Sequence, residues 1–279
     1  MQRVVLITGC STGIGHATAR RFLEEEWTVM ATARNRGDLD ALREAGCYTA
    51  ALDVTNDEQV EAVVADVIER WDRIDCVVNN AGFSQVGPLE DIPVERLETQ
   101  FDVNVYGPHR LVRAVLPHMR KREDGTIVNI SSGLGRVSIP GMGAYSGSKF
   151  ALEAMSDALR AEVDSLGIDV VLVEPGNVET RFSQRAAAEL RGLRRTTAYA
   201  TLYEIIDDWV ALGGFGPAEL TSRDVADVIV NAASSTDPEP RYTVGKTGQI
   251  ATLAGYLPAQ LRDAAFRIMF RAMSIRRNE

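Results

Sequence analysis

The sequence contains few cysteines and no long apolar segment. Its 279 residues include three cysteines, Cys10, Cys47 and Cys76, and so small and odd a number does not indicate a disulfide framework. No apolar run reaches the roughly 18 residues that a membrane span needs. The N-terminus lacks the pattern of a secretory signal, because the apolar run Val4–Ile7 leads directly into a glycine-containing loop. We therefore expect a cytoplasmic protein.

The sequence also lacks a basic excess and a cluster of histidines. The net charge is -9, and nucleic-acid binding requires a basic face, so we expect no nucleic-acid partner. The three histidines, His16, His109 and His118, are dispersed and have no acidic or cysteine neighbours at metal-ligand spacing. We therefore expect no metal site.

What the chain does contain is a regular alternation of short β-branched runs with longer amphipathic stretches. The predicted strands are Arg3–Thr8, Thr28–Ala33, Tyr48–Leu52, Cys76–Asn79, Thr126–Ile130, Asp169–Val173 and Arg241–Val244. The predicted helices are Ile14–Glu26, Asp57–Trp71, Val94–Met119, Gly147–Ser165 and Ser222–Ala233. This alternation predicts an α/β protein in which residues 1–279 form a single Rossmann domain, with a doubly wound parallel sheet of about seven strands and helices on both faces. Ligands of such sheets bind beyond the carboxyl ends of the strands.

Two segments interrupt the alternation. Residues 177–216 follow a strand, are rich in arginine and alanine, and are long enough to form a substrate-binding loop or lid. Residues 257–279 carry apolar side chains at helical spacing with arginines between them, which predicts a C-terminal helical extension. We favour a packing helix or a pocket wall over a membrane-surface helix, because the rest of the chain is acidic.

A glycine-containing loop joins the first predicted strand to the first predicted helix. It reads T-G-C-S-T-G-I-G from Thr8 to Gly15. Glycines in such a loop permit a tight turn, close approach of the backbone to a pyrophosphate, and close packing of helix on strand. The N–H groups at the helix N-terminus would face the anion. The position between strand and helix therefore favours a dinucleotide site over a purely structural turn.

The end of the second predicted strand bears on the choice between NADP and NAD. NAD sites usually have a carboxylate about 20 residues after the glycines, which accepts hydrogen bonds from the ribose. Residues 31–35 contain no acid, and Arg34 can instead pair with a 2′-phosphate, with Arg36 in support. The alternative is that Arg34 only begins a surface loop. We predict NADP(H), with NAD(H) as the second choice.

Polar residues follow the third and fourth predicted strands. Asp53 and Val54 are placed to contact an adenine, although Asp53 can equally serve a turn. The run Asn79–Gly82 is either a turn that stabilises the sheet or the floor of the cofactor site. After the sixth predicted strand, the segment from Pro175 to Thr180 can present backbone groups and a hydroxyl to a carboxamide.

The candidate reacting groups are Tyr145 and Lys149, four residues apart and therefore on one face of a helix. An ammonium about 4 Å from the phenol would lower its pKa from about 10 by up to about three units. Ser131 and Ser132 end the fifth predicted strand, where a hydroxyl can polarise a carbonyl oxygen. Asn104 is expected to open a long helix, where it could hold a water in a proton path or be a local polar residue.

In their order and spacing these motifs resemble the short-chain dehydrogenases/reductases, in the form with a T-G-x-x-x-G-I-G loop. The shared motifs, which span about five-sixths of the chain, are that loop, N-N-A-G, N-x-x-G, a serine followed by Y-x-x-x-K, and P-G-x-x-x-T. The resemblance implies reversible hydride transfer between a nicotinamide and a carbonyl or alcohol substrate. The stretch from Gly9 to Arg34 looks most like the steroid- and retinol-dehydrogenase-like branch, whose members tend to prefer NADP(H) or lipophilic substrates. Resemblance also implies a homodimer or homotetramer, formed through the helices of residues 104–119 and 147–165.

The resemblance also implies roles for individual residues. The implied catalytic tetrad is Asn104, Ser132, Tyr145 and Lys149, with Ser132 favoured over Ser131 by its spacing to the tyrosine. Lys149 would contact the nicotinamide ribose, and Val178 and Thr180 the carboxamide. The complete expected cofactor-binding set is Gly9, Ser11, Thr12, Gly13, Ile14, Gly15, Arg34, Asp53, Val54, Asn80, Ala81, Gly82, Tyr145, Lys149, Pro175, Gly176, Val178 and Thr180.

Two other functions use the same fold. A non-catalytic NADP-binding sensor or scaffold is disfavoured, because such proteins usually lose the tyrosine or the lysine and this chain keeps both. An epimerase or dehydratase with the same Tyr–Lys pair is disfavoured by the three-residue gap between Gly9 and Gly13 and by the chain length. The identity of the substrate depends on the shape of residues 177–216 and of the C-terminal segment, and the sequence does not reveal it.

Overall fold

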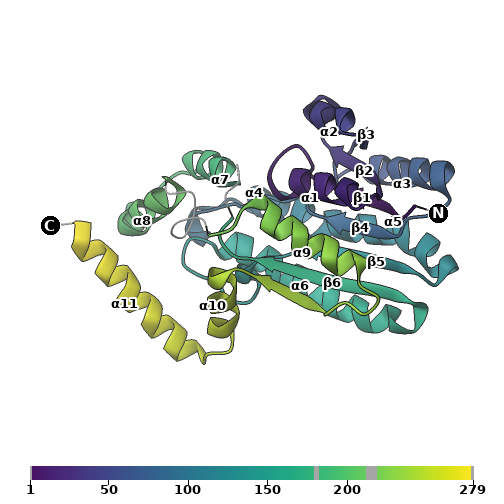
Figure 1. The fold of residues 1–279 in the computed structure, drawn as a ribbon. Helices are drawn as coiled ribbons and strands as arrows, with labels where there is room; N and C mark the ends of the chain where they lie inside the picture. The colour runs from purple at the N-terminus through teal and green to yellow at the C-terminus, as the bar shows by residue number, and fades with distance from the viewer. Residues whose placement is uncertain (1, 179–181, 212–218, 278–279) are drawn as a thin grey trace.

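Seven parallel strands form one sheet at the centre of the protein, in the order β3-β2-β1-β4-β5-β6-β7 (Figure 1). The computed structural model describes residues 2–178, 182–211 and 219–277. The strands are β1 (Val4–Ile7), β2 (Thr28–Ala33), β3 (Tyr48–Ala51), β4 (Cys76–Asn79), β5 (Gly125–Ile130), β6 (Ile168–Pro175) and β7 (Arg241–Val244). The predicted doubly wound parallel sheet is confirmed.

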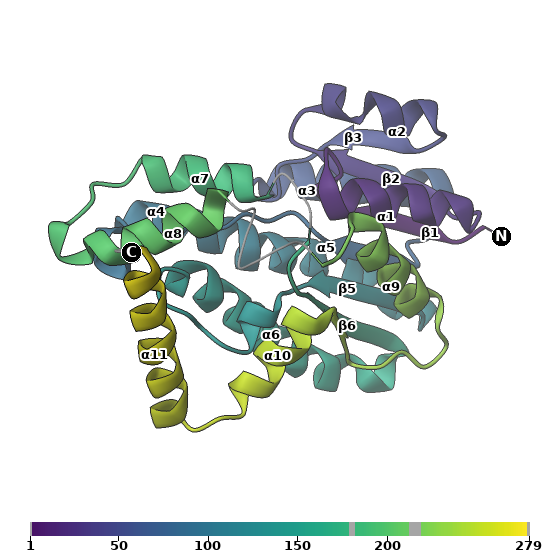
Figure 2. The ribbon, with the colours of Figure 1, turned by 60° about the vertical axis from the view of Figure 1, so that its left-hand side comes forward.

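Helices cover both faces of the sheet, as Figures 1 and 2 show. One face packs against α1 (Gly13–Glu24), α2 (Asp40–Glu44) and α9 (Ser222–Ser234), and the other against α3 (Asp57–Trp71), α5 (Gly107–Arg122) and α6 (Gly143–Val163). In β1, Val5 and Ile7 belong to the first core while Val4 and Leu6 belong to the second. A strand buried on both faces needs apolar residues at every position, which explains its continuous apolar run.

The predicted helix Val94–Met119 contains an irregular turn. The helix α4 (Val94–Phe101) continues into a π-helical turn at Asp102–Tyr106, and α5 follows directly. From the sequence we expected Asn104 to open a long helix. In the structure it lies inside a long helical segment instead. A π-turn accommodates one extra residue and changes which side chains face inward. It turns Asn104 into the protein, where only 1% of its surface is exposed.

The helix α6 begins four residues before the predicted start at Gly147. Gly143 is the first residue of this helix. A Cβ atom at Gly143 would lie 2.9 Å from the side chain of Leu89, so this glycine allows close packing rather than a break in the helix. As a result Tyr145 lies in the first turn of α6.

The chain after β6 forms helices that the sequence analysis had not placed. The segment 177–216 contains α7 (Phe182–Arg191), a short 3-10 turn at Thr197–Tyr199 and α8 (Ala200–Ala211), while residues 179–181 and 212–216 lie outside the described residues. α7 and α8 contribute to a third apolar cluster, separate from the two cores beside the sheet.

The C-terminal part of the chain forms α10 (Lys246–Gly255) and α11 (Ala259–Arg277), and α11 runs back towards α8 (Figure 2). Within 2–178, 182–211 and 219–277, no helix has both the length and the apolar character of a membrane span. The same residues contain no group of histidine, cysteine and acidic side chains suited to a metal ion.

Candidate active site

A cavity of about 780 Å³ lies beyond the carboxyl ends of the strands. Most of the residues expected to bind cofactor or substrate line it together. These are Gly9, Ser11, Thr12, Gly13, Ile14, Arg34, Asp53, Val54, Asn80, Ala81, Gly82, Ser132, Tyr145, Lys149, Pro175, Gly176 and Val178. Gly15 and Asn104 do not line the cavity, and Thr180 lies outside the described residues.

The glycines of the first loop have distinct geometries. Gly9 and Gly13 adopt φ values of +72° and +61°, a region that other residues rarely occupy. Gly15 lies behind the cavity, where a Cβ atom would come within 2.5 Å of the carbonyl oxygen of Gly9. It therefore supports the turn instead of facing a ligand. The helix α1 begins at Gly13, and the side chain of Thr12 does not cap it, which leaves N–H groups at the helix N-terminus open to the cavity.

Asn80 fastens the ends of β1 and β4 together. Its side-chain amide donates to the carbonyl oxygens of Thr8 (2.9 Å) and Gly9 (3.1 Å), and its own N–H donates to Thr8 Oγ1 (3.0 Å). The N–H of Ala81 donates to the same hydroxyl. The sequence left open whether this run is a turn that stabilises the sheet or the floor of the cofactor site. In the structure the run joins β1 to β4, and Asn80, Ala81 and Gly82 also line the cavity.

The two groups expected near the adenosine differ in how they are held. Arg34 is exposed at the end of β2 and lines the cavity. Asp53 also lines it, but its Oδ1 accepts hydrogen bonds from the N–H (3.0 Å) and hydroxyl (2.8 Å) of Thr55. The turn role considered for Asp53 is thus present, and Asn56 caps α3.

An additional arginine, Arg185 of α7, reaches the same cavity. Its guanidinium stacks 4.3 Å from the ring centroid of Phe83. Burial lowers the pKa of Arg185, and the positive charge of Arg34 lowers it further. Two arginines therefore face one cavity, a surrounding suited to an anionic ligand. The sequence analysis missed Arg185, because its place depends on how α7 folds over the sheet.

Tyr145 and Lys149 are both buried, with 8% and 6% of their surfaces exposed. The Lys149 ammonium donates a 2.7 Å hydrogen bond to the carbonyl oxygen of Ile130. Burial raises the pKa of the Tyr145 phenol to about 12, and its hydrogen bond with Ser132 opposes that rise. This direction is opposite to the one expected from the spacing, because burial destabilises the phenolate and the ammonium bonds to Ile130. Burial also lowers the pKa of Lys149 to about 8.

Asn104 is fully engaged by protein groups. Its Oδ1 accepts from the N–H of Phe83 (3.1 Å), and its Nδ2 donates to the carbonyl oxygen of Phe83 (3.0 Å) and to Ser148 Oγ (3.1 Å). These bonds join the loop after β4 to the helix that carries Tyr145. The side chain of Asn104 thus holds the wall of the site.

The segment after β6 is pinned to the loop before α4. The Asp91 carboxylate accepts from the N–H (3.0 Å) and hydroxyl (2.5 Å) of Thr196 and from the hydroxyl of Tyr203 (2.6 Å). Arg96 donates to the carbonyl oxygens of Glu189 and Gly192 at the end of α7, each at 2.8 Å. These contacts place the apolar side of α8 against the cavity.

The wall of the cavity away from the glycine loop is largely apolar. Its apolar side chains are Phe83, Val86, Leu134, Val137, Ile139, Met142, Ile206, Trp209, Val210, Ile250 and Phe266. Phe266 belongs to α11, which makes this helix part of the pocket wall, one of the two arrangements favoured from the sequence. Ile250 of α10 lines the cavity but is largely exposed, and so are Leu253 of α10 and Ile268 of α11.

The three cysteines are buried and unpaired. Burial raises the pKa of the Cys10 and Cys76 thiols above the ordinary range and that of Cys47 to about 12. They are thus unreactive packing residues at neutral pH.

Comparison with known proteins gives consistent matches. A sequence model described as short chain dehydrogenase matches residues 3–191. The uncharacterized oxidoreductase YbbO of Escherichia coli is 42% identical over 184 residues, 66% of this chain and 68% of that protein. A 3-ketodihydrosphingosine reductase of Bacteroides thetaiotaomicron is 34% identical over 276 residues, 96% and 98% of the two chains. Human retinol dehydrogenase 8 is 36% identical over 256 residues, 86% and 80% of the two chains.

Solved structures share the fold. A short-chain dehydrogenase from Streptomyces avermitilis superposes with a TM-score of 0.81 at 33% identity, covering 100% of this chain and 98% of that one. A metagenomic short-chain oxidoreductase in complex with NADP has a TM-score of 0.68 at 27% identity, covering 87% and 96%. A short-chain dehydrogenase/reductase from Burkholderia phymatum in complex with NAD has a TM-score of 0.74 at 26% identity, covering 86% and 88%. Structures with this fold therefore hold either dinucleotide.

Proposed function

Because this chain belongs to the short-chain dehydrogenase/reductase family of NAD(P)-dependent oxidoreductases, we propose that it interconverts a ketone or aldehyde and an alcohol on an apolar substrate with NADP(H). One observation carries the proposal. A single cavity is lined by the glycine loop and by Ser132, Tyr145 and Lys149. A dinucleotide and a carbonyl substrate can therefore meet there.

The residues around the glycine loop suit a dinucleotide. The open N–H groups of α1 would bind its pyrophosphate, and Asn80–Gly82 would lie along it. Arg34, with no carboxylate in residues 31–35, favours a 2′-phosphate and hence NADP(H) over NAD(H). Val178 and Thr180 would meet the carboxamide, although Thr180 lies outside the described residues. When bound, the dinucleotide supplies or accepts a hydride at its nicotinamide.

Tyr145 would act as the acid in reduction. With a pKa raised to about 12, its hydroxyl keeps its proton at neutral pH. As hydride adds to the carbonyl carbon, the carbonyl oxygen becomes negative and takes that proton from Tyr145 Oη. Ser132 would steady the same oxygen by a hydrogen bond, and the Lys149 ammonium would stabilise the phenolate that remains. In oxidation, the phenolate takes the proton back from the alcohol.

The proposed substrate has an extended apolar part. Ile206, Trp209 and Phe266 give the cavity an apolar wall away from the glycine loop. Two of the relatives are a 3-ketodihydrosphingosine reductase and retinol dehydrogenase 8. Retinol and 3-ketodihydrosphingosine each combine one reacting oxygen with a long hydrocarbon chain. Burying such a chain contributes about 0.8 kcal/mol per CH₂ group.

We also propose that the protein is a homodimer or homotetramer that assembles through α5 and α6. A partner could cover the half-exposed Phe150 and Met155 of α6 and the exposed Tyr106, which immediately precedes α5. Light scattering of the purified protein tests this assembly.

The proposed reaction is tested with a panel of aldehydes and ketones that differ in chain length, each offered with NADPH and with NADH. Consumption of NADPH that increases with chain length supports the proposal. Tight NADPH binding without turnover of any carbonyl would favour a sensor, and a strong preference for NADH would overturn the role of Arg34.

A further inference from the structure

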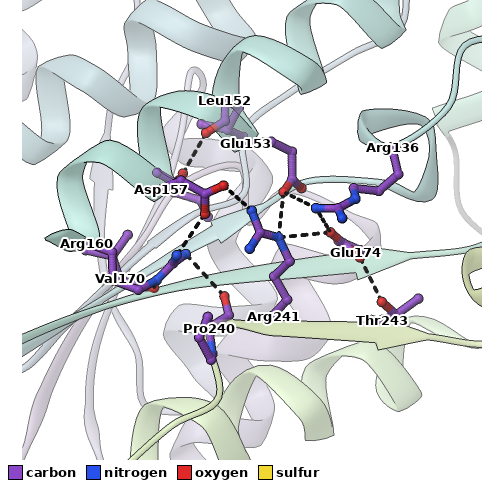
Figure 3. A network of polar contacts seen from close by, with 12 residues as sticks. Arg136, Leu152, Glu153, Asp157, Arg160, Val170, Glu174, Pro240, Arg241 and Thr243 are labelled. Carbon is purple, nitrogen blue, oxygen red and sulfur yellow. Dashed lines mark hydrogen bonds and ion pairs between the residues drawn. The ribbon is translucent and has the colours of Figure 1, made fainter. Parts of the chain in front are cut away.

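Two buried glutamates lie beside each other behind the reacting groups. Glu153 of α6 and Glu174 of β6 have 5% and 0% of their surfaces exposed, and Arg136 and Arg241 approach both carboxylates (Figure 3). Arg241 Nε lies 3.1 Å from Glu153 Oε2 and 3.5 Å from Glu174 Oε1. Arg136 lies 3.8 and 3.9 Å from the same two oxygens. The network therefore places two carboxyl groups beside two guanidinium groups, and Arg241 also pairs with Asp157.

Stability alone does not account for this network. Removing charges from water costs free energy that the pairing only partly offsets, and replacing a buried ion pair by apolar side chains is often neutral or stabilising. Apolar residues such as Val171 and Val173 occupy neighbouring positions of β6. The place of the network in the molecule is more informative than its contribution to stability.

Glu153 lies one helical turn after Lys149, on the same face of α6. The ammonium of Lys149 bonds to the neutral carbonyl of Ile130, and burial lowers its pKa to about 8. The negative charge of Glu153 opposes that decrease. Without this charge the lysine would lose its proton at a lower pH.

The geometry points to Glu153 as a positioning residue, whose carboxylate, oriented by Arg136 and Arg241, keeps the buried ammonium of Lys149 charged at neutral pH. This inference rests on the proposed function, in which Lys149 acts as a cation beside Tyr145.

The charged or hydrogen-bonding groups that face Glu153 come from every element packed around it. They are Ser131 after β5, Arg136 after the 3-10 turn Gly133–Gly135, Lys149 and Asp157 of α6, Glu174 of β6 and Arg241 of β7.

The state of Glu153 itself follows from these neighbours. Burial raises its pKa, and the charge of Glu174 raises it further. Hydrogen bonds from Ser131 and Arg241, together with the charge of Arg241, oppose the rise. The two arginines within 4 Å favour the carboxylate form of Glu153, the form that the inference requires.

The chain allows a direct test, because it contains only three lysines, Lys121, Lys149 and Lys246. NMR of the lysine side chains, labelled with ¹³C and ¹⁵N, therefore gives few signals, which the variants Lys121→Arg and Lys246→Arg assign. In the wild-type protein we expect Lys149 to titrate near pH 8. In Glu153→Gln its midpoint should fall by about one pH unit, the effect of losing one nearby charge.

Asp157→Asn is the matched control. Asp157 is one turn further along α6 and also pairs with Arg241, at 2.5 Å, but it is not among the charges that shift Lys149. We expect an unchanged Lys149 midpoint in this variant. A wild-type midpoint in folded Glu153→Gln, or an equal decrease in both variants, would overturn the inference.

A second variant acts in the opposite direction and guards against misfolding of the first. Arg136 is partly exposed, and Arg136→Gln removes a positive charge beside Glu153, which should raise the midpoint of Lys149. An unchanged or lower midpoint there contradicts the inference. Because the titration needs no substrate, it separates this inference from the proposed function: absent carbonyl turnover would count against the function alone. Where turnover is found, the alkaline limb of the pH profile should move to lower pH in Glu153→Gln.

Discussion

The Lys149 ammonium lies 5.8 Å from the centroid of the Tyr145 ring, facing the ring of the residue one helical turn before it. A cation at this distance interacts with the face of the aromatic ring. Its hydrogen bond goes to the backbone of β5 instead. The pair therefore holds a protonated phenol next to a fixed positive charge, an arrangement suited to giving a proton and then stabilising the anion.

Replacing the Tyr145 hydroxyl should abolish turnover while leaving the fold intact. We expect Tyr145→Phe to lower kcat by about 10²–10⁴-fold, the usual contribution of a general acid. The ring remains in the third apolar cluster, so the melting temperature should stay near that of the wild type. Reduction of a responsive carbonyl with NADPH gives the rate, and fluorescence titration gives NADPH binding. A variant that keeps a tenth of the activity would contradict the role of Tyr145.

Ser132→Ala should lower kcat by about 10²–10³-fold, the loss found when one donor to a developing oxyanion is removed. The Ser132 hydroxyl bonds to the Tyr145 phenol and also accepts from the N–H of Leu134 at 3.1 Å. Ser131→Ala is the control, since the two serines are neighbours and resemblance favours Ser132. A larger loss in the Ser131 variant would reverse this choice.

Arg34→Leu should weaken NADPH binding roughly ten- to hundredfold and leave NADH binding unchanged, because only NADPH carries the 2′-phosphate. Arg43→Leu provides a control, since Arg43 is exposed and pairs with Asp40 on α2. Dissociation constants for both nucleotides, measured by calorimetry, decide the point. Equal weakening of NADPH binding and NADH binding would show that Arg34 does not contact the 2′-phosphate.

Asp91→Ala should raise KM for long-chain substrates several-fold and leave NADPH binding unchanged. The carboxylate holds Thr196 and Tyr203, which position the apolar side of α8 in the cavity wall. Asp207→Asn is the control. Asp207 also lies on α8, but its exposed ion pair with Arg195 contributes little to holding this helix in place. A KM that changes for short substrates as much as for long ones would contradict this explanation.

Asp75 should make stability dependent on pH in the acid range. Burial alone would raise its pKa, but hydrogen bonds from Arg73, the N–H of Val4 and Arg122 outweigh it and lower the pKa. A group with a lowered pKa stabilises the fold above its unfolded pKa of about 3.9, and this contribution is lost as the pH falls through the folded value.

We therefore expect Asp75→Asn to lower the free energy of unfolding by about 3 kcal/mol at neutral pH, and by progressively less below about pH 4. Urea unfolding at a series of pH values measures the difference. Asp66→Asn, which breaks only an exposed pair with Arg70, should have almost no effect at any pH. A deficit for Asp75→Asn that is constant across the acid range would disprove the linkage.

The strands could be predicted closely from the sequence. The bounds of β4 and β7 agree with the predicted ranges Cys76–Asn79 and Arg241–Val244. A short continuous apolar run between two loops is typical of a strand in the middle of a parallel sheet, because helices bury both of its faces. The glycine loop could be found in the same way, because its residues adjoin a strand and a helix.

What could not be predicted depends on contacts between distant residues. The predicted start of α6 was wrong by four residues. The reason why a glycine stands at position 143 is its close packing against Leu89, which the sequence does not reveal. The direction of the Tyr145 pKa shift was wrong, because spacing along a helix does not reveal burial. Asp91 and Thr196 are 105 positions apart, and no local pattern in the sequence links them.

The π-helical turn at Asp102–Tyr106 has a consequence for how this chain can vary. A π-turn holds one residue more than an α-helical turn of similar rotation, so removing one residue would restore ordinary winding and leave α4 and α5 in nearly the same orientation. Leu111 and Val115 would stay buried against the sheet, but the side chains within the turn would change direction, and Asn104 would leave Phe83 and Ser148. A deletion here should thus preserve the fold and disturb the wall of the site, a separation that no single substitution in α5 would give.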